Sequence, residues 1–102
     1  MVDNPPVNRQ AGFQTRSQEQ VFNALLKLWD ERPGREIDPT SPITVNFRDI
    51  SLDLGFGVQH AASAKVKGWL LDHGFIRDHG RQGPRGNRIT VHPPPGYIAK
   101  GV

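Results

Sequence analysis

The first regular pattern in the chain is a stripe of apolar residues at the spacing of an α-helix. Its members are Val21, Phe22, Leu25, Leu26 and Trp29. Ser17 and Gln20 precede the stripe at the spacing of a capping box, in which each side chain binds a backbone N–H of the first turn. Pro33 and Gly34 follow it, and neither continues a helix well. We therefore expect a first helix from Ser17 to this Pro-Gly pair, followed by an irregular connector at 35–42.

The middle of the chain changes to a short β-branched run and then returns to helical spacing. The run at 43–45, Ile-Thr-Val, predicts a three-residue strand. Asn46 follows at an N-cap position, and Asp49 lies in the first turn, where its charge favours the positive end of the helix dipole. The second helix is expected to end at Gly55, because glycine tolerates the left-handed backbone of a helix end. Its expected buried residues are Phe47, Ile50 and Leu54.

A third helix and a hairpin occupy the rest of the patterned region. The helix is expected at 58–73, with Gly74 ending it, and its inward residues are Ala62, Val66, Trp69 and Leu70. Two apolar runs, 75–76 and 89–91, then flank a loop, as the strands of a β-hairpin do. The loop is longer than the two to five residues that a hairpin needs. It carries three glycines and three arginines, namely Gly80, Gly83, Gly86, Arg81, Arg85 and Arg88.

The two ends of the chain differ in composition from the region between them. Residues 1–14 are rich in Pro, Asn, Gln and Gly without any period, which is typical of a flexible arm. Three consecutive prolines at 93–95 impose extended polyproline geometry on the tail. The expected organisation is a flexible N-terminal arm (1–14), one folded domain (15–92) and a Pro-rich tail or linker (93–102). Both ends are expected to add little to the core.

Composition narrows the class of protein. The chain has 102 residues, of which 35% are hydrophobic, so we expect one small domain with one modest core. It contains no cysteine, which excludes disulfides, thiolate metal sites and cysteine nucleophiles. No apolar run approaches the length of a membrane span. A cytoplasmic protein without a membrane partner is therefore expected.

Positive charge is concentrated in the C-terminal quarter of the chain. The net charge is +3, yet residues 76–102 hold five Lys/Arg against one Asp, or +4, while residues 1–75 sum to −1. Localised positive charge is typical of a surface that binds nucleic acid. A solubilising surface would carry charge as well, so the distribution alone leaves both interpretations open.

The order of the predicted elements resembles that of a known superfamily. The order is helix, short strand, helix, tight turn, helix and hairpin, and the segment LLDHGFI joins the third helix to the hairpin. Over residues 17–92 the chain resembles the winged helix-turn-helix superfamily of DNA-binding domains, in which a recognition helix commonly ends Leu-x-x-x-Gly-apolar-Ile. The resemblance implies an α+β fold with three helices, a short strand and a C-terminal β-hairpin wing. Its departures are a longer connector after the first helix and Gly68 within the third.

The resemblance also implies which residues would bind double-stranded DNA. The third helix would enter the major groove, the start of the second would contact phosphates, and the hairpin loop would be the wing. Arginine in a narrow minor groove is held by its negative potential, and glycine lets a loop approach the backbone closely. The implied DNA-binding residues are Asn46 and Arg48 on the second helix, Gln59, His60, Ser63 and Lys67 on the third, and Arg77, Arg81, Arg85 and Arg88 in the wing.

Signals for catalysis or metal binding are weak in comparison. The four histidines, His60, His73, His79 and His92, show no metal-ligand spacing. Asp49 and Asp53 lie four residues apart, as the residues of a solvated helix face do. No glycine-rich phosphate loop follows a strand. We therefore expect no enzyme activity, no metal and no cofactor.

The function expected from the sequence is sequence-specific duplex DNA binding by a transcriptional regulator of prokaryotic, phage or plasmid type. A homodimer is possible for such a regulator, with Trp29 and Leu71 as candidate contacts that could equally belong to the core. Two alternatives stay open. The chain could be the DNA-binding domain of a replication or partition initiator, or a winged helix used for protein–protein contact. The basic loop argues against the second alternative.

Overall fold

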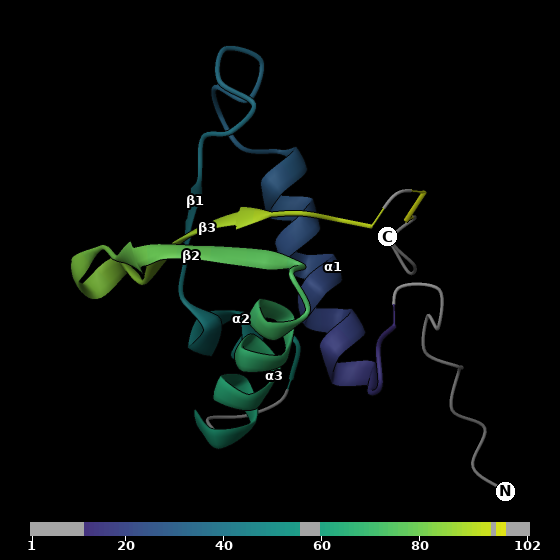
Figure 1. Ribbon diagram of the computed structural model, residues 1–102. Coiled ribbons are helices and arrows are strands. Elements are labelled where there is room, and N and C mark those ends of the chain that lie inside the picture. The colour runs from purple at the N-terminus through teal and green to yellow at the C-terminus, as the bar shows by residue number, and fades with distance from the viewer. Residues whose placement is uncertain (1–11, 56–59, 95, 98–102) are drawn as a thin grey trace, which may run out of the picture.

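The computed structural model describes residues 12–55, 60–94 and 96–97, except for the side chains of 60–63. The described chain is an α+β arrangement of three α-helices and a three-stranded antiparallel sheet (Figure 1). In chain order the elements are α1 (Arg16–Asp30), β1 (Ile43–Val45), α2 (Phe47–Asp53), α3 (His60–Asp72), β2 (Ile76–Arg81), the short 3₁₀-helix η2 (Gly83–Arg85) and β3 (Asn87–Val91). The predicted fold class and element order are confirmed at this level.

Helix α1 begins at Arg16, and Thr15 caps it two residues before the predicted cap, Ser17. The Thr15 hydroxyl accepts from the backbone N–H of Gln18 at 3.2 Å, and the Gln18 amide oxygen accepts from the N–H of Thr15 at 3.2 Å. Thr15 and Gln18 have the same three-residue spacing as Ser17 and Gln20, so spacing alone cannot choose between the two pairs. The helix ends at Asp30, before the predicted Pro-Gly stop.

The short helices end and begin as their local signals indicate. The Asn46 side chain caps α2 by accepting from the N–H of Arg48 at 2.9 Å, and Gly55 follows the helix with φ of +81°. At the end of α3 the N–H of Phe75 bonds the carbonyl of Leu70 at 3.0 Å, and the N–H of Gly74 bonds that of Leu71 at 3.2 Å. This is a Schellman motif, which Gly74 allows with φ of +75°. The predicted start of α3 at 58–59 lies outside the described residues.

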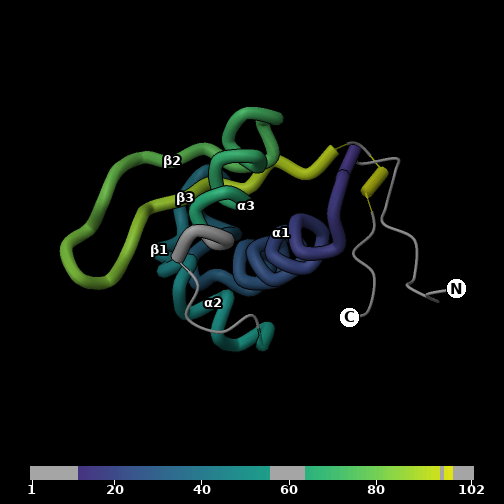
Figure 2. The backbone as a smooth tube through the Cα atoms, turned by 90° about the horizontal axis from the view of Figure 1, so that it is seen from below, coloured from purple at the N-terminus to yellow at the C-terminus, as the bar shows by residue number. Residues whose placement is uncertain are grey.

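The sheet has the strand order β1-β3-β2, with both pairings antiparallel. Ile43 faces Ile89 and Ile76 faces Val91, so the apolar residues of all three strands meet on one face. That face packs on the helices, because α1 contacts β3 and α3 contacts β2. The tip of the β2–β3 hairpin extends beyond the helices in both views (Figures 1 and 2). None of the helices in the described part of the chain is long and apolar enough to cross a membrane.

A cluster of aromatic rings forms one end of the core and includes residues from both predicted tails. Phe13 is 3% exposed, and its ring lies 5.2 Å from that of Phe75 and 5.7 Å from that of Phe22. Tyr97 packs on Phe22 with centroids 5.4 Å apart, and its hydroxyl donates to the side-chain oxygen of Asn23. Burial and the charge of Glu19 raise the pKa of Tyr97 to about 12. The prediction that residues 1–14 and 93–102 add little to the core is wrong at Phe13 and Tyr97.

Candidate functional site

A groove of about 400 Å³ lies between the start of α2, one face of α3 and the β2–β3 hairpin. We call it the basic groove. Four of the predicted DNA-binding residues line it, namely Asn46, Arg48, Lys67 and Arg81. They come from three separate elements, so the fold collects residues that are up to 35 positions apart. Phe47, Ala64, Pro84, Gly86 and Asn87 complete its lining.

The other predicted residues divide into three groups. Arg85 lies in η2 at the hairpin tip and is exposed, next to Pro84 of the groove lining. Arg77 and Arg88 are exposed on the opposite face of the sheet, because they alternate with the buried residues of β2 and β3. Gln59 lies outside the described residues, and the structure places His60 and Ser63 in α3 without describing their side chains.

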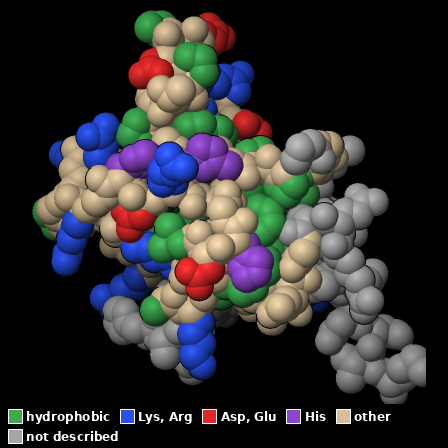
Figure 3. All heavy atoms as spheres, in the orientation of Figure 1, with side chains coloured by type: hydrophobic (Ala, Val, Ile, Leu, Met, Phe, Trp, Pro, Cys, Tyr) green, Lys and Arg blue, Asp and Glu red, His purple; other side chains and the backbone are tan. Residues whose placement is uncertain are grey.

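The outer face of the sheet, formed by Thr44, Arg77, His79, Arg88, Thr90 and His92, is polar and positively charged. The ring Nε2 atoms of His79 and His92 lie 2.9 Å and 3.0 Å from the Thr90 hydroxyl, which their side chains help to bury. Figure 3 shows histidine and Lys/Arg side chains next to one another on this side of the molecule. Arg77 and Arg88 therefore cannot reach into the basic groove, and the ten predicted residues do not form one continuous site.

Lys67 already has two partners within the protein. Its ammonium lies 3.1 Å from Asp78 Oδ2 and 5.4 Å from the centroid of the Phe47 ring. Both side chains of the ion pair are mostly buried, with exposed fractions of 26% for Lys67 and 23% for Asp78. The prediction of Lys67 as a residue free to contact DNA did not include this pair, because Asp78 lies on another element.

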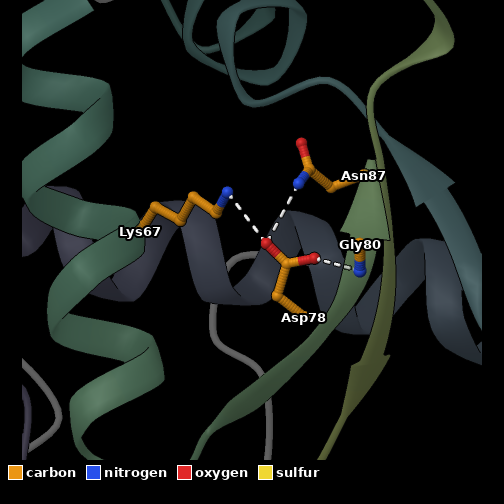
Figure 4. Close-up of polar contacts among 4 residues, drawn as sticks. All are labelled: Lys67, Asp78, Gly80 and Asn87. Atoms are coloured by element: carbon orange, nitrogen blue, oxygen red, sulfur yellow. Dashed lines mark hydrogen bonds and ion pairs between the residues drawn. The ribbon is translucent and has the colours of Figure 1, made fainter. Parts of the chain in front are cut away.

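Asp78 is the centre of a small polar network (Figure 4). Its Oδ1 accepts from the backbone N–H of Gly80 at 2.8 Å, and its Oδ2 accepts from Asn87 Nδ2 at 3.0 Å as well as from Lys67. The carboxylate thus joins β2, β3 and α3. Burial raises the pKa of Asp78, but the hydrogen bonds from Gly80, Lys67 and Asn87 and the charge of Lys67 outweigh it and lower that pKa below its ordinary value.

This depressed pKa predicts an acid-dependent stability. A carboxyl group whose folded-state pKa lies below its unfolded value of about 3.9 stabilises the fold above that pH. The contribution is lost as the pH falls through the folded-state pKa. Asp78→Asn should lower the melting temperature by roughly 4–8 °C at neutral pH, and the difference from the parent should shrink as the pH falls through the lowered folded-state pKa of Asp78. Thermal unfolding across this range checks it.

Asp72→Asn is the matched control for that experiment. Asp72 is exposed at the end of α3, and its side chain makes no hydrogen bond or ion pair within the described residues. The substitution removes the same charge without touching the network. If both variants differ from the parent equally at every pH, the Asp78 network does not stabilise the fold.

Gly86 holds the hairpin against the junction of β1 and α2. A Cβ atom added to it would lie 2.1 Å from the carbonyl oxygen of Val45 and 2.9 Å from the backbone nitrogen of Asn46. The N–H of Gln82 donates to the carbonyl of Gly86 at 2.7 Å, and the hydroxyl of Thr44 donates to the Gln82 side chain at 3.0 Å. The base of the loop is therefore packed on β1, and its tip projects from a fixed position.

Sequence reasoning missed Asp78 and Asn87 as residues that shape the site, and it expected Gly86 to let the loop approach DNA, whereas Gly86 packs on the backbone of Val45 and Asn46. One signal was available: Asp78 is the single acidic residue between 76 and 102. An isolated acid in a basic segment often has a specific cationic partner, and the β-strand alternation would have placed Asp78 on the inner face with Ile76. The roles of Gly86 and Asn87 depend on contacts that the local pattern does not contain.

Comparison with known proteins adds no assignment. No protein-family model matches the chain, no curated protein matches it, and no solved structure matches it. Within the described residues, no group of three or more His, Cys, Asp or Glu side chains could hold a metal ion. An interpretation of function must therefore start from the basic groove and the two faces of the hairpin.

Proposed function

We propose that the chain is a winged helix-turn-helix domain that binds duplex DNA through the basic groove and the hairpin tip. The observation that carries the proposal is the convergence of Arg48, Lys67 and Arg81 from α2, α3 and β2 on one groove. The element order and the antiparallel β2–β3 hairpin are compatible with such a domain. In this proposal α3 is the recognition helix and the hairpin is the wing.

The exposed side of α3 suits an approach to the major groove. Ala64 and Lys65 are exposed on α3, and Ala64 lines the basic groove one turn before Lys67. A small residue at this position lets a helix come close to base edges, and lysine can donate to guanine O6 and N7. His60 and Ser63 on the same helix, with Gln59 before it, are the further candidates for base contacts.

The start of α2 and the wing would provide the phosphate contacts. Asn46 uses its side-chain oxygen to cap α2, which leaves the two donors of its amide nitrogen for a phosphate. Arg48 is exposed beside it, and Arg81 and Arg85 are exposed on the wing. Arginine binds phosphate through several N–H donors in a fixed plane, so these side chains can fix the orientation of the duplex.

A regulatory role would require sequence-specific binding, and we propose a homodimer for that role. The two candidate contact residues, Trp29 and Leu71, both have partners within the chain and do not mark a dimer surface. Trp29 is partly buried, with the Arg32 guanidinium 3.5 Å from its ring centroid, and Leu71 packs partly against the core. Selection of bound sequences from a random duplex pool, with stoichiometry measured on the best sequence, would establish both the target and the oligomeric state.

The proposed function predicts strongly salt-dependent binding. With about four to eight phosphate contacts, the logarithm of the affinity for duplex DNA should fall with the logarithm of the salt concentration at a slope of about −4 to −7. Fluorescence anisotropy with a labelled duplex at several salt concentrations measures the slope. Absence of binding at low salt, or a flat dependence, would exclude the nucleic-acid function and favour the protein-contact alternative.

Arg81→Ala and Arg77→Ala form a matched pair within this test. Both remove one positive charge from β2, but Arg81 lines the basic groove and Arg77 lies on the outer face. Arg81→Ala should make the slope shallower by about one unit, and Arg77→Ala should change it less. The reverse result would move the DNA interface to the outer face of the sheet.

A further inference from the structure

The Lys67 ammonium is held from two sides before any ligand arrives. Asp78 on β2 pairs with it at 3.1 Å, and the Phe47 ring on α2 lies 5.4 Å away, within the range of a cation–π contact. An exposed lysine side chain usually samples many rotamers and acts as a diffuse charge. This one is restricted at its charged end by partners on two other elements.

Asp78 occupies a position that is unfavourable for binding a polyanion. It lies beside the basic groove, so its carboxylate repels phosphate, and its pairing with Lys67 cancels one of the few cations on that surface. A neutral residue there would give any duplex a stronger attraction. Asp78 therefore does not increase the affinity for DNA, and its role must follow from its contacts within the protein.

Those contacts tie the wing to the helix that would read the bases. Asp78 holds the N–H of Gly80 in its own strand, the side chain of Asn87 in β3 and the ammonium of Lys67 in α3. It also lies at the point where the pairing of β2 with β3 becomes irregular, between Asp78 and Arg81. An irregular strand pairing lets the end of a hairpin change direction, and the three contacts restrict that change.

We propose that Asp78 is a positioning residue that fixes the wing against α3 and orients the Lys67 ammonium, increasing the specificity of DNA binding at the expense of affinity for any duplex. This inference rests on the proposed function. An ammonium has three N–H donors, so Lys67 can keep Asp78 and still direct the other two at acceptors on a base edge. The charge of Lys67 is already compensated by Asp78. Lys67 therefore releases few counterions from DNA, and counterion release is what drives non-specific binding.

The test compares two ligands, a random-sequence duplex pool and the best sequence selected from it, across salt concentrations. Asp78→Asn keeps an oxygen for the N–H of Gly80, and the Asn87 amide can turn to accept from the new amide group. The variant thus loses the charge and the acceptor that hold Lys67, and keeps the other two contacts. We expect its affinity for the random pool to rise about three- to tenfold, as one uncompensated charge at partly screened distance would give. The slope of log affinity against log salt concentration should steepen by about one unit. The preference for the selected sequence over the random pool should fall by about three- to tenfold.

A double-mutant cycle shows whether the effect passes through Lys67. In the Lys67→Ala background, Asp78→Asn should no longer steepen the slope or reduce the preference. Asp72→Asn controls for net charge, since it removes an exposed acid from α3 without touching the network, and it should change both ligands alike. If Asp78→Asn changes both ligands alike, or acts equally without Lys67, the orientation of Lys67 is not its role and the proposal is overturned.

Positioning of the wing has a readout that does not involve DNA. Asp78→Ala removes the acceptor of the Gly80 N–H, so exchange of that amide with solvent, and of the β2 and β3 amides beyond it, should quicken by at least tenfold relative to Asp72→Ala. Unchanged exchange would overturn the positioning role even if DNA binds as proposed. If exchange quickens but the protein binds no duplex, the proposed function is overturned, and so is the effect on specificity. The role of Asp78 in positioning the hairpin would then still stand.

Discussion

Gly86→Ala should destabilise the protein by about 3–5 kcal/mol, at the upper end of what single substitutions do. The added Cβ would lie 2.1 Å from the carbonyl oxygen of Val45, a backbone atom that cannot turn aside as a flexible side chain does. Gly86 also has φ of +115° and ψ of −148°, a conformation close to one that is almost confined to glycine. Both effects act together, so the hairpin must leave its place on β1 or β1 must shift.

Under the proposed function, Gly86→Ala should also weaken DNA binding, separately from its effect on stability. Val45 and Asn46 join β1 to α2, and the same segment lines the basic groove with Gly86. Displacing the hairpin separates Arg81 from Arg48, so duplex affinity should fall at least tenfold even at temperatures where the variant is folded. Urea unfolding and anisotropy on the same preparation measure the two effects.

Gly80→Ala is the matched control for this prediction. Gly80 has φ of +112°, nearly the same as Gly86, but an added Cβ would meet nothing within 4 Å. It therefore carries the backbone cost, about 1 kcal/mol or somewhat more, without the clash. If the two variants are equally stable, Gly86 does not touch β1 and the hairpin is not anchored there.

The contrast between these two glycines shows what the sequence can and cannot predict. Gly80, Gly83 and Gly86 all have positive φ, as expected for a glycine-rich loop, and the local pattern treats them alike. Only the contact with Val45, which is 41 positions away, distinguishes Gly86. Local signals such as the Asn46 cap and the Gly74 helix end were predictable because every participating atom lies within a few residues.

The candidate site was predictable to the same extent. Arg48, Lys67 and Arg81 were proposed from the order of elements, and the fold brings them to one groove. Strand alternation was enough to place Arg77 and Arg88 on the outer face, since Ile76 and Ile89 face the core. Alternation alone would also place Arg81 there, and the irregular pairing between Asp78 and Arg81 is what turns it to the groove. The pairing of Lys67 with Asp78 was not predictable, because it depends on how α3 crosses β2.

Phe13 is the clearest case of a residue whose importance lies outside its local sequence. Its neighbours along the chain are polar or glycine, which favoured a flexible arm. In the fold its ring contacts those of Phe22, Trp69, Phe75 and Tyr97, at centroid distances between 5.2 and 6.0 Å. These residues come from α1, α3, the start of the hairpin and the C-terminal tail, so Phe13 links parts of the chain that are far apart.

Phe13→Ala should therefore cost about 3–5 kcal/mol of unfolding free energy, the range found for removing a buried phenylalanine side chain. The loss combines the burial of the ring, the cavity left behind and the ring–ring contacts, each worth about 0.5–1.5 kcal/mol beyond burial. A small domain has a total stability of about 5–15 kcal/mol, so the variant should be partly unfolded at 37 °C or close to it. The midpoint of urea unfolding, at unchanged m-value, measures the loss.

Phe13→Leu is the control variant that keeps an apolar side chain at this position. Leucine keeps most of the apolar volume, so this variant should lose less than half of what alanine loses. Under the proposed function, both variants should show the parent's salt slope for DNA wherever they are folded, because Phe13 lies in the aromatic cluster and does not line the basic groove. If Phe13→Ala is as stable as the parent, the folded domain begins at Thr15 as the sequence pattern suggested, and the aromatic cluster does not depend on the segment before it.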